Sequence, residues 1–353
     1  MMQRTVTISV DKANFLKKNK LDILFEESRR VVNLYITSLW ENKNFSSKFV
    51  VVKVDTWLSA RLQQCLGKQA LQIVKSQRRK NKKIMPIFKK DVIEFDERFT
   101  DIRFNDNSFD IWVKLTSIGN KMSIKLPSRK HKHLNKYLMS GWILKKSTRL
   151  RKFDGKYCID LYFEKSEPVK ITTGRSVGCD IGYKKLLVFS DGSQSNTDFT
   201  KIYKKISRKK QGSKQFKKTL KERDNLINRE INSLNLQGVK TFVVEDLKNV
   251  KHKSKFSKKF NNLCQRWSYP KVLDKMGRFC EENGIGFIKV SPAYTSQICS
   301  VCGFRHSDNR KGEKFLCGKC GVKMDADYNA SVNILCRGVY SPSAIGIKDA
   351  CNV

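Results

Sequence analysis

The sequence lacks any apolar run of about 18 residues, the shortest length typical of a membrane-spanning helix. Its first six residues contain neither the apolar segment nor the small-residue cleavage site of a secretory signal peptide. Acidic residues are scarce relative to basic ones, with 33 Asp and Glu against 72 Lys and Arg. These absences argue against the membrane-spanning and secreted classes, and they predict a cytoplasmic, strongly basic protein.

The formal net charge is +39, and the basic residues are spread over most of the chain. Such a charge opposes compaction by self-repulsion unless a polyanion neutralises it. Nucleic acid is the expected partner, through phosphate contacts and counterion release. An anionic membrane surface is the alternative, but a membrane-binding chain would concentrate its charge on one amphipathic helix. No membrane partner is therefore predicted.

Cysteines occur eleven times, an odd number that does not suit a secreted disulfide framework. Four of them form two CxxC pairs, Cys299 with Cys302 and Cys317 with Cys320, separated by fourteen residues. Two such pairs can place four thiolates around one Zn²⁺. The spacing predicts a closed, structural zinc site, with His306 as a weaker alternative ligand.

The amino-terminal half alternates between strand and helix patterns. A strand over residues 3–10 precedes an amphipathic helix from about residue 20 and a second helix that starts near Asp55 and Thr56. Short strands then follow between residues 92 and 164, with a basic turn over residues 128–133. The pattern predicts an antiparallel β-barrel interrupted by a helical insert. The basic residues at the end of the second helix are either a solvated helix end or a nucleic-acid contact, and we favour the contact: Arg78, Arg79, Lys80, Lys82 and Lys83.

The carboxy-terminal half has an α/β pattern. Its expected strands cover residues 176–180, 186–189, 193–199, 241–245 and 286–290, and its expected helices cover residues 201–234 and 264–283 and the segment from residue 327. One face of the first helix is strongly basic, and like charges there repel each other. We predict nucleic-acid contact for Arg208, Lys209, Lys210, Lys214, Lys217 and Lys218.

Three acids stand where such a layout can bring them together. Asp180 and Glu245 end apolar strands, and Asp327 starts a helix. Oxygen ligands of this kind suit Mg²⁺ or Mn²⁺, and two such ions can hydrolyse a phosphodiester. Their neighbours Asp191, Asp246 and Asp325 are competing candidates, interpreted here as turn, edge and N-cap acids.

These motifs resemble a known family. The segments TSQICSVCG (residues 295–303), FLCGKCG (315–321) and DYNASVNI (327–334) closely resemble the carboxy-terminal half of TnpB proteins. TnpB proteins are transposon-encoded, RNA-guided DNA endonucleases related to compact type V CRISPR effectors. The segments GCDIG (178–182) and VVEDL (243–247) resemble the other two pieces of that family's RuvC-like nuclease.

The resemblance implies an α/β RNase H-like (RuvC-like) core with an inserted zinc ribbon, preceded by the barrel and its helical insert. It implies that Asp180, Glu245 and Asp327 are the catalytic metal ligands, and that a guide RNA directs cleavage of DNA beside a short flanking motif. It also implies an association with the prokaryotic nucleoid. Two alternatives remain, a nuclease-silent RNA-guided repressor and a guide-free zinc-ribbon DNA-binding protein or transposase.

The expected domains follow from the resemblance and from the element pattern together. They are a wedge-like barrel (residues 1–12 and 91–168), a helical recognition domain (13–90), a RuvC-like nuclease domain (169–291 and 325–338), a zinc-ribbon insert (292–324) and a tail (339–353).

Overall fold

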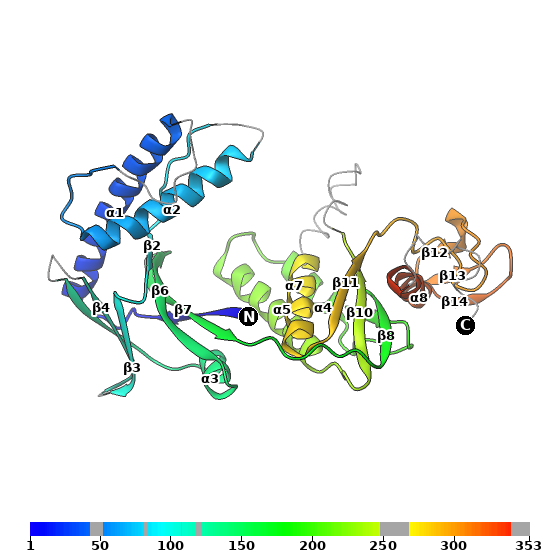
Figure 1. Cartoon of the computed structure of the whole chain (residues 1–353). Helices are drawn as coiled ribbons and strands as arrows, with labels where there is room; N and C mark the ends of the chain where they lie inside the picture. The colour runs from blue at the N-terminus through cyan, green and yellow to red at the C-terminus, as the bar shows by residue number, and fades with distance from the viewer. Residues whose placement is uncertain (43–51, 81–83, 107, 118–121, 248–267, 340–353) are drawn as a thin grey trace. The chain divides into compact units, whose positions relative to one another are not determined.

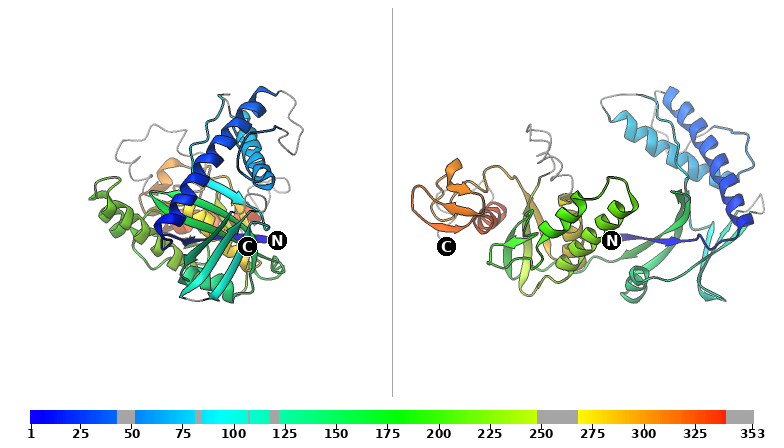
Figure 2. Two further views of the ribbon diagram at one scale, coloured as in Figure 1. Left: turned by 90° about the vertical axis from the view of Figure 1, so that its left-hand side faces the viewer. Right: turned by 180° about the vertical axis from the view of Figure 1, so that it is seen from behind.

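The computed structural model describes residues 1–42, 52–80, 84–106, 108–117, 122–247 and 268–339, drawn in Figures 1 and 2. The chain divides into two compact units, Met1–Ser166 and Glu167–Val353, called here the amino-terminal and carboxy-terminal units. None of the helices in the described ranges combines the length and the apolar composition that a membrane crossing needs. Most of the predicted tail lies outside the described residues.

Two antiparallel sheets form the β part of the amino-terminal unit. One has the order β1-β7-β6-β2, from Met2–Ser9, Lys156–Lys165, Ile143–Phe153 and Val92–Phe95. The other has the order β3-β4-β5, from Thr100–Asp106, Phe109–Thr116 and Ser123–Ser128. Along β1 buried and exposed residues alternate without a break, as expected for a strand with one face on the core. Both sheets contribute to a single hydrophobic core. The predicted barrel stays a prediction.

Helices α1 (Phe15–Glu41) and α2 (Ala60–Arg78) pack against each other and share that core. The side chain of Ser59 caps α2, so the prediction that this helix starts near residue 55 was wrong by about one turn. The predicted basic turn over residues 128–133 runs into a further helix, α3 (Lys132–Met139). The imidazole of His131 accepts the Leu134 N–H and caps α3. Imidazole is an uncommon cap, which explains why sequence reasoning missed this helix.

The carboxy-terminal unit is built on a sheet of order β11-β10-β8-β9, from Gly286–Val290, Val239–Glu245, Arg175–Asp180 and Val188–Phe189. β8, β10 and β11 run parallel, and β9 pairs antiparallel with β8. The central strands are apolar on both faces, as expected for a sheet covered on both sides. Residues 193–199, predicted as a strand, contain two isolated bridges, at Gln194 and Asp198, and lead into a helix.

Helices cover both faces of this sheet (Figure 1). On one face lie α4 (Phe199–Ser207), α5 (Lys214–Asn232) and α7 (Tyr269–Glu282), which pack on alternate residues of β8 and β10. On the other face α8 (Ala326–Val339) packs on Val243 of β10. The helix predicted over residues 201–234 is two helices, because the chain turns at Gly212 with φ at +83°. α7 starts at Tyr269, and residues 264–267 of its predicted range lie outside the described residues.

A small three-stranded sheet stands between β11 and α8 in the sequence. It consists of β12 (Arg310–Lys311), β13 (Lys314–Leu316) and β14 (Lys323–Asp325), preceded by a short 3-10 helix at Ser307–Asn309. We call residues 299–325 the ribbon. Its core is the buried ring of Phe315 packed beside Cys299 and Cys317. So small a core needs an additional constraint to be stable on its own.

Candidate active site

The first two predicted acids lie at neighbouring strand ends. β8 pairs with β10 so that Cys179 faces Val244, and Asp180 and Glu245 are the next residue of each strand. Both line one cavity of about 580 Å³, together with Asp246, Thr295, Arg310 and other residues of the 291–296 segment. Ligand sites of open α/β sheets lie outside the carboxyl ends of the parallel strands. The cavity is therefore at the edge where such a sheet binds its ligands.

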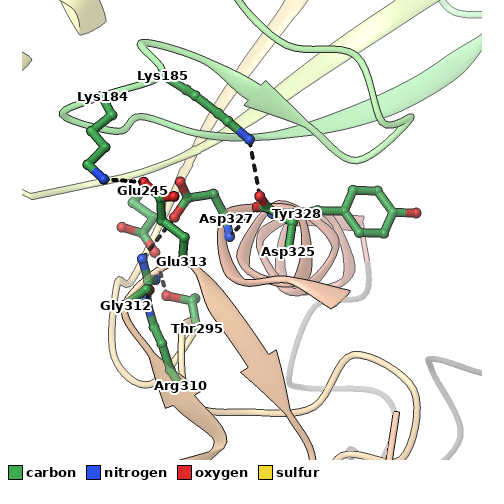
Figure 3. A network of polar contacts seen from close by, with 10 residues as sticks. All are labelled: Lys184, Lys185, Glu245, Thr295, Arg310, Gly312, Glu313, Asp325, Asp327 and Tyr328. Carbon is green, nitrogen blue, oxygen red and sulfur yellow. Dashed lines mark hydrogen bonds and ion pairs between the residues drawn. The ribbon is translucent and has the colours of Figure 1, made fainter. Parts of the chain in front are cut away.

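Asp327 reaches the same region from the other direction. It stands in the first turn of α8, where Asp325 accepts the N–H groups of Asp327 (2.9 Å) and Tyr328 (3.1 Å) and caps the helix. Its own carboxylate accepts a hydrogen bond from Arg310 Nη2 at 2.8 Å, and Figure 3 shows this pair beside Glu245. Because Arg310 also lines the cavity, Asp327 is connected to the first two acids through one guanidinium.

Close packing holds α8 against β8. A Cβ on Gly178 would lie 2.1 Å from the carbonyl oxygen of Ser331 and 2.7 Å from the Leu335 nitrogen. Only glycine allows the helix backbone to approach the strand this closely. Gly178 is two residues before Asp180, so the same contact that seats α8 sets how near Asp327 comes to the strand ends.

The electrostatics of the cavity reflect a cluster of like charges. Burial, with the neighbouring charges of Glu245 and Asp327, raises the pKa of Asp180 to about 8, against the opposing effect of Arg310. Burial also raises the pKa of Glu245, although the Thr295 hydroxyl and the charges of Arg337 and Arg310 oppose this rise. A carboxylate cluster that resists ionisation in this way is typical of a functional site or of a site that gains a cation.

Two of the three competing acids, Asp191 and Asp325, have structural roles of their own. Asp191 accepts hydrogen bonds from the N–H and hydroxyl of Ser193 and pairs with Arg175 at 3.2 Å, as a turn acid does. Asp325 caps α8, so its interpretation as an N-cap is confirmed. Asp246 follows Glu245 and also lines the cavity.

The four predicted cysteine ligands come together. Their sulfur atoms lie within 4.8 Å of one another, with Cys299 and Cys320 3.7 Å apart and Cys302 and Cys317 3.5 Å apart. Tetrahedral zinc with Zn–S bonds of about 2.3 Å needs sulfur atoms roughly 3.8 Å apart. Burial raises the pKa of the Cys317 thiol, but the N–H groups of Cys320 and Lys319 outweigh it, and the pKa falls to about 6. Burial raises the pKa values of the Cys299 and Cys302 thiols, so the fit to a zinc ion rests on the geometry of the four sulfur atoms and on sulfur as a zinc ligand.

His306, the alternative zinc ligand, has another role. Its Nδ1 accepts the Asp308 N–H at 3.2 Å and caps the 3-10 helix of the ribbon. Among the described residues, a group of at least three His, Cys, Asp or Glu side chains can share a metal ion where their ligand atoms lie close enough together. The four cysteines form such a group. Asp180, Glu245 and Asp327 do not form such a group, and the Asp327 carboxylate is bonded to Arg310.

The predicted nucleic-acid contacts fall into two groups. The residues on and beside α4 and α5 are all exposed: Arg208, Lys209, Lys210, Lys214, Lys217 and Lys218. At the end of α2, Arg79 and Lys80 are exposed, and Lys82 and Lys83 lie outside the described residues. Arg78 donates hydrogen bonds to the carbonyls of Leu39, Trp40 and Asn42 and thereby caps α1. Its role in binding nucleic acid stays a prediction, since the same guanidinium already serves the fold.

Sequence reasoning assigned no role to three groups that touch this site. Arg310 bonds Asp327, the Thr295 hydroxyl donates to Glu245, and Asn333 of α8 donates to the Thr295 carbonyl. For Asn333 the sequence did contain a signal: Asn329 and Asn333 are four residues apart and therefore lie on one face of the predicted helix, among apolar residues. Nothing in the sequence marks Arg310 among 72 basic residues.

Part of this sequence is similar to known proteins. The family model described as the Cas12f1-like TNB domain matches residues 269–334. The chain is 38% identical over 113 residues to the CRISPR-associated endodeoxyribonuclease Cas12f1 of Sulfoacidibacillus thermotolerans, covering 32% of this chain and 25% of that protein. It is 36% identical over 100 residues to a TnpB-like protein of Aquifex aeolicus, covering 28% and 33%. The chain thus matches between a quarter and a third of the length of these curated relatives.

A solved structure extends the likeness to most of the fold. The cryo-EM structure of a Cas12f1–sgRNA–target DNA complex aligns with a TM-score of 0.57, covering 88% of this chain and 81% of that chain at 16% sequence identity. At this identity the match concerns the fold alone. The sequence matches cover about a third of this chain, and the fold match covers most of it.

Proposed function

Because the chain belongs to the family of TnpB proteins and compact type V effectors, we propose that it is an RNA-guided DNA endonuclease. One observation carries the proposal: Asp180 and Glu245 end adjacent parallel strands and line one cavity with Arg310, whose guanidinium holds Asp327. Two acids at one cavity, with a third held beside it by Arg310, are unfavourable for folding unless cations offset their charges. The RNase H-like (RuvC-like) assignment of the carboxy-terminal unit belongs to this proposal.

Asp180, Glu245 and Asp327 are proposed to hold Mg²⁺ or Mn²⁺. Their ligand atoms are all carboxylate oxygens, which suit hard divalent ions. Bound as a pair, such ions activate a water and stabilise the leaving oxygen of a phosphodiester. The chain's own contribution is to bring the acids together: the parallel pairing of β8 and β10 places Asp180 and Glu245, and the Gly178 contact seats the helix that presents Asp327. Arg310 then supplies a positive charge beside the reacting phosphate.

The cysteine cluster is proposed to hold one structural Zn²⁺. Four protein sulfur ligands fill a tetrahedral shell, which leaves no position for a substrate. The metal would take over the stabilising role that a larger core plays in other domains, since the ribbon buries little more than Phe315. Its function in this account is to fix the segment that carries Arg310.

Guide RNA and target DNA are the proposed partners. The net charge of +39 and the exposed basic residues of α4 and α5 supply the phosphate contacts that such a complex needs. In RNA-guided recognition base pairing reads the sequence, while the protein contacts the backbone and a short flanking motif. Recognition of that motif is proposed for the amino-terminal unit.

The test is guided cleavage with purified protein. RNA that co-purifies is sequenced, and matching double-stranded DNA is incubated with the complex and Mg²⁺. The wild type is expected to cut, Asp180→Ala to lose cleavage while it retains RNA, and Asp191→Ala to cut normally. Asp191 is the matched control because it lies in the turn after β9 and pairs with Arg175.

Other outcomes identify the alternatives. Guided binding without cleavage by the wild type indicates a nuclease-silent repressor. DNA binding by RNA-free protein indicates a guide-free zinc-ribbon protein. Equal cleavage by wild type and Asp180→Ala removes the assignment of the active site.

A further inference from the structure

We propose that Thr295 is the positioning residue of Glu245. Asn329 and Asn333 hold the Thr295 backbone in place and link it to the cysteines that bind zinc. Thr295 is 2% exposed, and its hydroxyl donates a hydrogen bond to Glu245 Oε1. With that oxygen engaged, the orientation of the Glu245 carboxylate is fixed and the second oxygen remains for a cation. The inference rests on the proposed function of the carboxylate site.

The backbone before Thr295 is strained in a way that fixes its orientation. Tyr294 has φ at +65°, a left-handed conformation that is a genuine outlier for an aromatic residue. Its carbonyl accepts the N–H groups of Gln297 (2.9 Å) and Ile298 (3.1 Å), and the guanidinium of Arg305 lies 3.4 Å from its ring centroid. Strained residues persist where their surroundings over-determine them, and they cluster at functional sites. The strain turns the chain so that the next side chain, Thr295, faces Glu245.

A polar stripe on α8 holds this segment. Asn333 Nδ2 donates to the carbonyls of Thr295 (2.8 Å) and Ile298 (2.7 Å), and Arg337 Nη1 donates to those of Ser291 (2.6 Å) and Ala293 (2.8 Å). Residues four apart lie on one helix face, so Asn329, Asn333 and Arg337 present their side chains in one row. The row belongs to the helix that carries Asp327. The segment that orients Glu245 is therefore tied to the helix that supplies the third acid.

The stripe also reaches the cysteine cluster. Asn329 is fully buried; its Oδ1 accepts the Ser300 N–H at 2.9 Å, and its Nδ2 donates to the Ile298 carbonyl at 2.8 Å. Ser300 directly follows Cys299, whose sulfur belongs to the cluster. A continuous series of hydrogen bonds thus runs from the cysteine cluster through Asn329, Ile298 and Asn333 to Thr295 and Glu245. Buried polar networks of this kind are rigid when every member is satisfied.

Asparagines of α8 that only stabilise the fold would also bond to the carbonyls of the 291–298 segment. The test therefore needs a readout that a structural role does not change. That readout is divalent-ion affinity at the carboxylate site. Partners that orient a ligating carboxylate typically change metal affinity by about 10–100-fold when they are removed. Loss of one buried hydrogen bond elsewhere lowers stability without changing that affinity.

The experiment compares Thr295→Val, Thr295→Ser and Thr219→Val in the full chain. Thr219 is the matched control because it is also 2% exposed and its hydroxyl donates to a carbonyl, that of Gln215 in α5. Mn²⁺ binding is titrated by electron paramagnetic resonance of the free ion, with zinc content and the melting temperature recorded for each protein. Asp180→Ala identifies the signal that belongs to the carboxylate site.

Thr295→Val is expected to weaken Mn²⁺ binding by about 10–100-fold with unchanged zinc content, and Thr295→Ser to bind within about threefold of wild type. Thr219→Val should melt lower yet bind Mn²⁺ normally. Equal Mn²⁺ affinity of Thr295→Val and wild type overturns the inference and leaves the proposed function intact. If wild type and Asp180→Ala bind Mn²⁺ equally, no binding belongs to the carboxylate site, and the proposed function and the inference are overturned together.

Asn333→Ala tests the second step. This variant keeps the Thr295 hydroxyl and removes the amide that holds its backbone, so it should also weaken Mn²⁺ binding while zinc remains bound. Wild-type Mn²⁺ affinity in Asn333→Ala would overturn the link to the cysteine cluster.

Discussion

The Arg310 guanidinium lies 2.8 Å from the Asp327 carboxylate and joins the ribbon to the first turn of α8. The pair is mostly buried, with side-chain exposures of 32% and 17%. Arg310 also opposes the high pKa values of Asp180 and Glu245. One basic side chain of the ribbon thus offsets part of the repulsion among all three acids.

Replacing Arg310 should make the protein depend on metal for stability. In EDTA, Arg310→Ala is expected to be less stable than wild type by about 1 kcal/mol, because a partly buried acid loses its partner. Added Mg²⁺ should recover most of this loss, since the cation replaces the missing charge. Denaturant unfolding in EDTA and in Mg²⁺ measures both values.

Arg278→Ala is the control for that experiment, because Arg278 forms an exposed pair with Asp274 four residues away in α7. Its stability should respond to Mg²⁺ as the wild type does. An identical Mg²⁺ response in Arg310→Ala and Arg278→Ala would contradict the role given to Arg310.

Asp180→Asn should stabilise the metal-free protein, and more so at higher pH. The folded pKa of about 8 lies above the ordinary aspartate value of 3.8, so ionisation of this carboxyl opposes folding. The penalty is absent below about pH 4, grows as pH rises from 4 to 8 and is constant above. Because Asp180 is only partly buried, the expected gain at pH 8 is about 1–2 kcal/mol rather than the full value of the shift. Denaturant unfolding in EDTA at pH 5 and pH 8 measures the difference in unfolding free energy between Asp180→Asn and wild type. A difference that becomes smaller as the pH rises would contradict the raised pKa of Asp180.

Gly178→Ala should displace α8 from β8. The new Cβ would lie 2.1 Å from the Ser331 carbonyl oxygen, so helix or strand must shift, at a cost of about 1–3 kcal/mol. Gly277→Ala in α7 is the matched control: its Cβ would make ordinary 3.5 Å contacts with the Phe287 ring. Alanine in a helix is favourable, so this control should gain up to about 1 kcal/mol. Equal unfolding free energies for the two variants would show that the close approach is not needed.

Zinc content should be one ion per chain and should depend on the paired cysteines. Cys317→Ser removes a buried sulfur from the cluster and is expected to lower the zinc content severalfold and to unfold the ribbon. Cys158→Ser, a half-buried thiol of β7, should retain the full amount. Metal analysis by mass spectrometry measures this, and a full zinc complement in Cys317→Ser would contradict the assignment.

Sequence patterns predicted the parts of this site that depend on local rules. An apolar strand that ends in an acid identified Asp180 and Glu245, and parallel strands bring such ends to one edge of a sheet. The CxxC spacing identified the cysteine cluster because sulfur ligands for zinc need tight turns. These features could be predicted because each depends on the types and spacing of a few residues that are neighbours in the sequence.

The remaining features depend on tertiary contacts. Arg310 is one basic residue among many, and only the folded ribbon brings it to Asp327. Arg78 belongs to a run of basic residues that is typical of a nucleic-acid contact. Its guanidinium nevertheless caps α1, through the carbonyl of Asn42, 36 residues away in the sequence. The start of α3 was missed because its cap is an imidazole. In each case the partner lies outside the local pattern or is an unusual residue type.

The proposed nuclease activity requires Asp180, Glu245 and Asp327 to share divalent ions. The most direct measurement is anomalous diffraction from Mn²⁺-soaked crystals of the protein with guide RNA and DNA. Manganese peaks are expected roughly 2.1–2.3 Å from carboxylate oxygens of these three residues, with Arg310 released from Asp327. Manganese bound only elsewhere, with Arg310 still paired to Asp327, would contradict the account.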